Sequence, residues 1–125
     1  MVKDKKKETP LSLAAYQRVA HVAETSRRTE QRLFAEITAA LGAAWEGGQR
    51  GAALMPALHR NRELWTTLSA DCGAAGNGLP HALRASIISL ALWVDRFTSD
   101  VVAGREPVEP LLEINRAMME GLGGP

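Results

Sequence analysis

Seven apolar residues in the second half of the chain recur at intervals of three or four, which places them on one face of a single long helix. Pro80 suits the first turn of this helix, where its missing N–H has no intrahelical acceptor, and Gly104 suits the left-handed conformation that ends a helix. The pattern therefore predicts a helix over 80–103 with an apolar face that other elements must cover. The seven residues are Leu79, Leu83, Ile87, Leu90, Val94, Phe97 and Val101.

The rest of the chain shows weaker versions of the same pattern, which predict helices over 12–24, over 27–45, over about 54–72 and after Pro110. No stretch of four or more residues alternates between apolar and polar side chains as a half-buried strand would. Short connections favour antiparallel neighbours, so we predict an all-α fold, a small bundle of four or five mostly antiparallel helices. The inner face predicted for the third helix consists of Leu54, Leu58, Asn61, Trp65, Leu68 and Cys72.

The junction between the first two predicted helices allows two interpretations. Thr25 and Ser26 can cap a new helix, and the apolar stripe of the first helix is interrupted there, which favours a break. Arg27 and Arg28 would then lie at a helix N-terminus, where each cation is unfavourable by roughly 0.3–1 kcal/mol at an exposed position. A single kinked helix therefore stays open as the alternative.

The charge distribution separates a short N-terminal segment from the rest of the chain. All four lysines lie within residues 1–10, and every later basic residue is an arginine. We predict that residues 1–10 form a solvated, disordered tail and that residues 11–125 form one domain, a size that suits a single apolar core. The net charge of the whole chain is only +1, which gives no strong field for a nucleic acid or an anionic membrane.

No apolar stretch approaches the length needed to cross a bilayer, and the start of the chain lacks the apolar segment of a secretory signal. A single cysteine cannot form an internal disulfide, which fits a reducing compartment. We therefore predict a cytoplasmic protein without membrane insertion.

The residues that usually carry catalysis or metal binding are scattered. His21, His59 and His81 have no partner at the spacing that places two ligands on one helical face. Cys72 ends an apolar helical face and is predicted to be a buried structural thiol. The glycines within 47–51 are not followed by the Gly-Lys-Ser/Thr of a phosphate-binding loop, and the carboxylates stand singly. We predict no enzyme activity, no metal and no cofactor.

Tryptophan and asparagine carry the remaining signals. Trp65 lies on the inner face of its helix, whereas we expect at least one of Trp45 and Trp93 to be partly exposed, as in a protein-binding surface. Asn61 and Asn115 lie on apolar faces, where a hydrogen-bonded core position is favoured over a position at the edge of a groove.

A series of short segments follows in order along the chain. It comprises Ala-Tyr-Gln-Arg-Val-Ala from Ala15, Thr29-Glu30, Arg32-Leu33-Phe34-Ala35-Glu36, Asn61-Arg62-Glu63-Leu64-Trp65, Ala70-Asp71-Cys72, Leu79-Pro80, Ile87-Ile88-Ser89-Leu90 with Trp93, and Ile114-Asn115-Arg116. Together these segments resemble the flagellar biosynthesis regulator FlaF family, and the resemblance extends over about residues 13–122. The lysine-rich segment lies outside it.

What the resemblance implies is a small helical cytoplasmic protein that binds flagellin before export, supports flagellin production and is needed for flagellum assembly. Other flagellar regulatory proteins are candidate further partners. Flagellin has amphipathic terminal segments that would self-associate, and a helical partner can cover their apolar faces in a groove. The residues that we predict to form this groove combine an apolar floor with an arginine rim: Tyr16, Val19, Arg28, Arg32, Trp93 and Arg96.

Two other functions stay open. The close spacing of Arg27, Arg28 and Arg32 would suit an RNA-directed regulator of flagellin messages, as would the pair Arg60 and Arg62. The near-neutral charge and the small number of aromatic residues beside these arginines argue against RNA. In the other alternative, the apolar surface of the long helix beyond its main stripe pairs with a second copy in a structural homo-oligomer.

Overall fold

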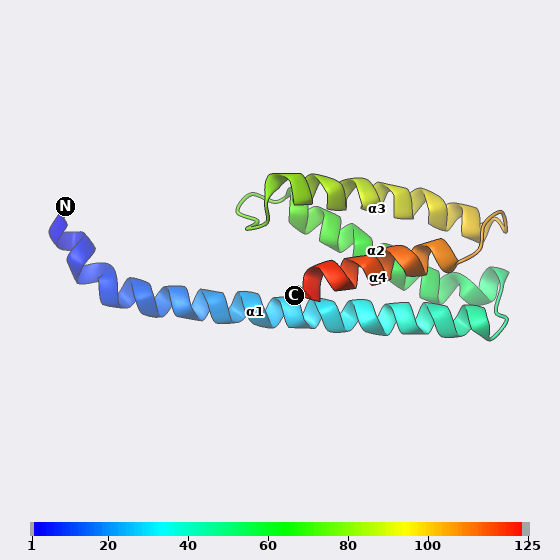
Figure 1. Cartoon of the computed structure of the whole chain (residues 1–125), viewed down its shortest axis with the longest axis horizontal. Helices are drawn as coiled ribbons and strands as arrows, with labels where there is room; N and C mark the ends of the chain where they lie inside the picture. The colour runs from blue at the N-terminus through cyan, green and yellow to red at the C-terminus, as the bar shows by residue number, and fades with distance from the viewer. Residues whose placement is uncertain (1, 124–125) are drawn as a thin grey trace. The chain divides into compact units, whose positions relative to one another are not determined.

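The computed structural model describes the backbone of residues 2–123 and the side chains of residues 13–15, 17 and 28–121. No strand occurs within this described part of the chain, and the predicted all-α class is confirmed. The elements are α1 (Val2–Glu46), the 3₁₀ helix η1 (Gly51–Leu54), α2 (Met55–Gly73), α3 (His81–Val102) and α4 (Glu109–Gly123), as Figure 1 shows.

The chain divides into two compact units, Met1–Leu33 and Phe34–Pro125. The first unit is formed by the N-terminal part of α1. The second unit contains the C-terminal part of α1 together with all the other elements, and its consecutive α-helices alternate in direction (Figure 1). The predicted small antiparallel bundle is therefore found in the second unit.

The predicted break near residue 25 is wrong, because α1 continues without interruption from Val2 to Glu46. The chain contains no glycine or proline between Leu11 and Leu41, so nothing there forces the backbone out of the helical conformation. A cap by Thr25 or Ser26 would also leave Arg27 and Arg28 at a helix N-terminus, whereas within a continuous helix they face no such penalty.

The N-terminal segment lies within the same helix. α1 begins at Val2 and so includes the backbone of the lysine-rich segment over 2–10. The side chains of this segment lie outside the described residues. The division into a tail over 1–10 and a domain over 11–125 stays a prediction.

Two glycines with left-handed backbone conformations follow the ends of helices, as the sequence predicted for Gly104. Gly48 has φ +86° and follows α1, and Gly104 has φ +77° and follows α3. After α1, the Gln49 N–H donates to the Ala44 carbonyl at 3.0 Å, which satisfies a carbonyl at the end of the helix. These turns allow the next element to run back along the one before it.

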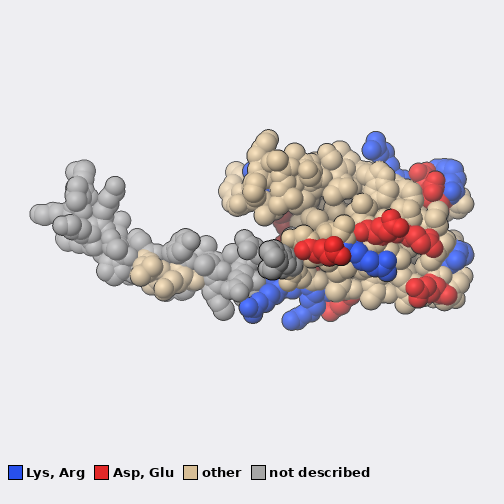
Figure 2. Space-filling view, viewed as in Figure 1, with Lys and Arg blue, Asp and Glu red and all other residues tan. Residues whose placement is uncertain are grey.

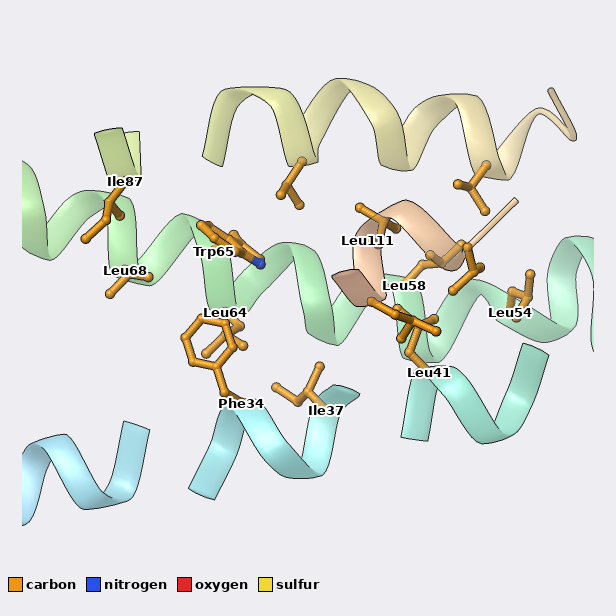
Figure 3. Close-up of a cluster of buried hydrophobic side chains, with 14 of the residues drawn as sticks. Phe34, Ile37, Leu41, Leu54, Leu58, Leu64, Trp65, Leu68, Ile87 and Leu111 are labelled. Carbon is orange, nitrogen blue, oxygen red and sulfur yellow. The ribbon is translucent and has the colours of Figure 1, made fainter. Parts of the chain in front are cut away.

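The core lies in the second unit, and each of its elements contributes one face. All six residues predicted for the inner face of the third helix are buried. In α3, Ile87, Val94 and Val101 are buried, whereas Leu83, which the sequence placed in the same stripe, is 45% exposed. The buried apolar residues are Phe34, Ile37, Leu41, Leu54, Leu58, Leu64, Trp65, Leu68, Cys72, Ile87, Val94, Val101, Val108, Leu111 and Leu112 (Figure 3).

A buried polar network joins three helices in the middle of this core. The Trp65 Nε1–H of α2 donates to Asn115 Oδ1 of α4 at 2.8 Å. The Asn115 Nδ2 group donates to Thr38 Oγ1 of α1 at 3.0 Å and to Asn61 Oδ1 of α2 at 2.7 Å. Asn61 and Asn115 are fully buried, so the predicted hydrogen-bonded core position of both asparagines is confirmed.

We expect Asn115→Ala to lower the free energy of unfolding by roughly 2–5 kcal/mol, because it leaves the Trp65 N–H and two further buried polar groups without their partner. Urea denaturation followed by tryptophan fluorescence measures the change. Glu113→Ala, at an exposed position of the same helix, is the control and is expected to stay within about 0.5 kcal/mol of the unmodified protein. Equal effects of the two substitutions would contradict the structural role of the network.

Candidate functional site

The six residues predicted for the groove are distributed over the two units. Arg28 and Arg32 lie in the first unit with exposed side chains, and the side chains of Tyr16 and Val19 lie outside the described residues. Trp93 and Arg96 belong to α3 in the second unit, where Trp93 is half-buried and Arg96 is exposed. The combination of all six in one site stays a prediction, and the described geometry concerns the part on α3.

The two tryptophans outside the core are both partly exposed, as the sequence predicted for at least one of them. Trp93 stacks on Phe97 of the next turn, with ring centroids 4.7 Å apart and an interplanar angle of 19°. This stacking holds the Trp93 ring at the edge of the core, against which both rings pack while remaining partly exposed. A rigid, half-exposed indole is a frequent centre of a protein-binding surface.

Around Trp93, the side of α3 that faces away from the core exposes apolar and small residues. Leu92 is 61% exposed and Leu83 is 45% exposed, whereas Leu90 is half-buried. The buried residues Ile87, Val94 and Val101 repeat every seventh residue and therefore lie on one side of α3. The opposite half of the helix has no covering element in the described part of the chain. We name this surface the α3 outer face and define it by Ala82, Leu83, Ala85, Ser86, Ser89, Leu90, Leu92 and Trp93. Leu83 and Leu90 belong to the apolar stripe of α3, which the neighbouring helices leave partly uncovered, and the other six residues lie beside or opposite this stripe.

The α3 outer face lies in the least charged part of the sequence. Between Asp71 and Asp95 the only Lys, Arg, Asp or Glu residue is Arg84. Figure 2 shows the corresponding surface over the first half of α3 as almost free of charged side chains, whereas charges of both signs gather elsewhere on the second unit. Exposed apolar residues without nearby charge are typical of protein-binding surfaces.

The Arg84 guanidinium group contacts the backbone of the turn between α2 and α3. Its Nε donates to the Cys72 carbonyl at 2.6 Å, and its Nη2 donates to the Ala74 carbonyl at 3.2 Å. These carbonyls lie at the C-terminal end of α2, where a cation is favourable. Arg84 therefore closes the turn between α2 and α3 and leaves the α3 outer face uncharged.

Arg62 performs a similar task farther along the boundary between α2 and α3. Its Nε lies 2.9 Å from Asp95 Oδ1, and its Nη2 donates to the Asp95 carbonyl at 2.8 Å and to Ser99 Oγ at 2.9 Å. These contacts fix α3 against α2. The arginine that the sequence analysis considered as a phosphate contact instead binds a carboxylate within the fold.

A third arginine closes the turn after α1. The Arg50 guanidinium lies 3.3 Å from the centroid of the Trp45 ring, and its Nη1 donates to the Trp45 carbonyl at 2.9 Å. The Trp45 Nε1–H donates to Glu109 Oε1 at 2.6 Å, which ties the end of α1 to the start of α4. A hollow of about 450 Å³ lies beside Arg50 and also borders the turn between α3 and α4. Because Arg50 is already held by the ring and the carbonyl, we assign these residues to the stability of the turns.

The described residues contain no group of three or more His, Cys, Asp or Glu side chains that could hold a metal ion. Cys72 is buried, as the sequence predicted. Within the same part of the chain no helix is both long enough and apolar enough to span a membrane.

The sequence predicted Trp93 for the groove but did not single out the small residues beside it. The predicted stripe of α3 consists of large apolar residues, so Ala82, Ala85, Ser86 and Ser89 are not part of the predicted groove. The scarcity of charged residues between Asp71 and Asp95, where Arg84 is the only one, is the signal that could have revealed the surface from the sequence.

A family model described as "Flagellar protein FlaF" matches residues 12–122, which is nearly the whole chain. The chain belongs to the FlaF family. The resemblance found in the short sequence segments is thereby confirmed, and the chain is a flagellar protein. No curated protein and no solved structure gives a significant match to this FlaF-family chain.

The orientation of α3 in this FlaF-family protein can be tested with two neighbouring substitutions. Leu92→Ser removes an exposed side chain, so we expect the free energy of unfolding to change by less than about 0.5 kcal/mol. Val94→Ser places a hydroxyl at a fully buried position, so we expect a loss of roughly 2–4 kcal/mol. Urea denaturation at low protein concentration measures both changes. A larger loss for Leu92→Ser than for Val94→Ser would show that α3 presents the other face to the core.

Proposed function

We propose that this FlaF-family protein is a non-enzymatic, cytoplasmic chaperone that binds flagellin before export and thereby also regulates flagellin synthesis. The observation that carries the proposal is the α3 outer face, an apolar, nearly uncharged surface on a helix whose other side is fixed in the core. Membership of the FlaF family supports a flagellar partner.

The chemistry of the α3 outer face supports an amphipathic helix as the guest. Leu83, Leu90, Leu92 and Trp93 offer apolar contacts along several turns, which suits the apolar residues that repeat along one side of such a helix. The exposed Arg96 lies one turn beyond Leu92 and can pair with a carboxylate at the edge of the guest. Covering the apolar side of a flagellin terminus in this way would suppress premature polymerisation.

The residues predicted on α1 complete the proposal. Tyr16, Val19, Arg28 and Arg32 supply a second set of apolar and basic contacts in the first unit. Two contact regions on one chain would allow specific capture by contacts that are individually weak, because the second contact forms at a high effective concentration once the first has formed. Such binding remains reversible, as release for export requires.

Four of the seven arginines of the second unit favour a protein guest over RNA, whereas Arg60, Arg96 and Arg116 are exposed. Arg62, Arg84, Arg50 and Arg105 each contact a carboxylate, a carbonyl or an aromatic ring within the fold. A phosphate-binding surface needs cations that are directed toward solvent. RNA binding would show itself by a steep loss of affinity with rising salt, whereas binding through the α3 outer face changes little with salt.

We expect Trp93→Ala to weaken flagellin binding by about 30-fold, the effect of losing about 2 kcal/mol at a central aromatic contact. Titration calorimetry with purified monomeric flagellin measures the dissociation constant, and circular dichroism verifies that the variant is folded. Tyr16→Ala tests the contribution of the first unit in the same assay.

Met55→Ala is the matched control, because Met55 is 41% exposed but lies at the start of α2, outside the α3 outer face. We expect this variant to bind flagellin as the unmodified protein does. Full binding by folded Trp93→Ala would remove the α3 outer face from the site. An unmodified protein that does not bind flagellin at micromolar concentrations would overturn the proposed function itself.

A further inference from the structure

We infer that the hollow of about 450 Å³ beside Arg50 binds a carboxylate that is attached to an apolar, branched group. We name it the Arg50 hollow. It lies at the end of the bundle, where the turn after α1 and the turn between α3 and α4 come together (Figure 1). Its size suits a small molecule or the end of a peptide. None of its lining residues belongs to the α3 outer face, so the inference does not rest on flagellin binding.

The base of the Arg50 hollow is apolar. Leu54 and Val101 line it and are almost fully buried within the core, so they form its floor. Val102 also lines the hollow but is 40% exposed, so its side chain is covered when the hollow is filled. A branched apolar group suits this lining because it removes both its own surface and that of Val102 from water.

Arg50 supplies a fixed set of hydrogen-bond donors. Its Nη1 donates to the Trp45 carbonyl at 2.9 Å and to the Gln49 carbonyl at 2.6 Å, and the Trp45 ring lies against the guanidinium group. Its Nε and Nη2 have no acceptor among the described residues. These two nitrogens form the edge with which an arginine binds both oxygens of a carboxylate. The contacts that stabilise the turn therefore also hold this edge ready for a ligand.

Arg105 adds a second cation to the same hollow. Its Nε and Nη2 share Asp100 Oδ1, at 3.3 and 2.9 Å, whereas its Nη1 has no acceptor among the residues that the structure describes. The charged side chains that line the hollow are thus Arg50, Arg105 and Glu106, two cations and one anion. This balance favours an anionic ligand.

The backbone around the hollow also favours an anion. The hollow borders the C-terminal ends of α1 and α3, where free carbonyls would by themselves favour a cation. The Trp45 carbonyl, however, accepts from the Gly48 N–H as well as from Arg50, and the Val101 carbonyl accepts from the Gly104 N–H. The groups that the two arginines leave free are donors, so the matching ligand supplies acceptors.

The floor and the two arginines together select a carboxylate over the phosphate of a nucleic acid. A nucleic-acid backbone carries no branched apolar group next to its charge and would leave Leu54 and Val101 uncovered. A carboxylic acid with a branched aliphatic chain matches both parts of the hollow. This chemistry occurs in a free branched acid and at the carboxyl end of a peptide whose last side chain is aliphatic.

Two-dimensional amide NMR of the isotope-labelled full chain tests the inference, with isocaproate as the probe. We expect the Trp45 indole signal and the Gly104 amide signal to shift, with a dissociation constant on the order of 1–10 mM for so small a ligand. Isocaproamide has the same shape without the charge, and acetate has the charge without the branch. Each of these two compounds is expected to bind at least about tenfold more weakly than isocaproate.

Two substitutions remove the donors one at a time. Arg50→Gln and Arg105→Gln are each expected to raise the dissociation constant of isocaproate at least about fivefold. Arg105→Gln leaves the turn after α1 intact, because the Arg105 guanidinium bonds to Asp100, outside that turn. Arg60→Gln is the matched control, since Arg60 is an exposed arginine of α2 that does not line the Arg50 hollow, and it is expected to leave binding unchanged. Circular dichroism verifies the fold of each variant.

A peptide probe separates the two sources of the carboxylate. Tighter binding of N-acetyl-alanyl-leucine than of isocaproate assigns the hollow to the carboxyl end of a peptide, because the added peptide bond then makes contacts of its own. Equal or weaker binding of the peptide assigns the hollow to a free branched acid.

Three results would overturn the inference: no shift with either probe at about 50 mM, binding of isocaproamide or acetate equal to that of isocaproate, or equal effects of Arg60→Gln and Arg50→Gln. None of these results bears on flagellin binding, which is measured with flagellin added. A protein that binds isocaproate as described but ignores flagellin would in turn refute only the proposed function.

Discussion

The hydrogen bonds of Asn115 fix the arrangement on which the rest of the second unit depends. Asn115 accepts from the Trp65 N–H of α2 and donates to Thr38 of α1 and Asn61 of α2, all within the core. Apolar side chains alone tolerate small shifts of one helix against another, whereas a buried amide must keep its partners. A slip of α4 by one residue would rotate the helix by about 100° and bring a different side chain to the place of Asn115.

Asn61 shows how closely this network is determined. Its Oδ1 accepts from Asn115, but its Nδ2 has no acceptor among the described residues. The unpaired Nδ2 group of Asn61 is unfavourable by roughly 1–3 kcal/mol because it is buried. The Oδ1 group of the same amide is nevertheless used, since it accepts from Asn115. The acceptor oxygen, which determines the position of α4, is the part of Asn61 that the fold uses.

The polar contacts of α3 are of a different kind, because they come from arginines at its edges. Arg62 binds Asp95 and Ser99 from α2, and Arg84 binds the carbonyls at the end of α2. Both charges are thereby turned toward α2. The result is a helix held in place from one side, with an opposite side that carries apolar residues and little charge, which is the physical basis of the α3 outer face.

The sequence predicted the helices well where apolar residues repeat strictly and where glycine or proline marks an end. The range 80–103 agrees with α3 within one residue at each end, and Gly104 has the left-handed conformation expected of it. The break near residue 25 was wrong because the ability of Thr25 and Ser26 to cap a helix does not by itself end one.

The site was harder to predict than the fold. The apolar stripe of α3 has seven members in sequence, but the neighbouring helices cover only part of it, so Leu83 is exposed. Which members are covered depends on the positions of α1, α2 and α4, and these follow from long-range contacts such as that between Trp65 and Asn115, 50 residues apart. Periodicity identifies the faces of a helix but does not tell which face remains open.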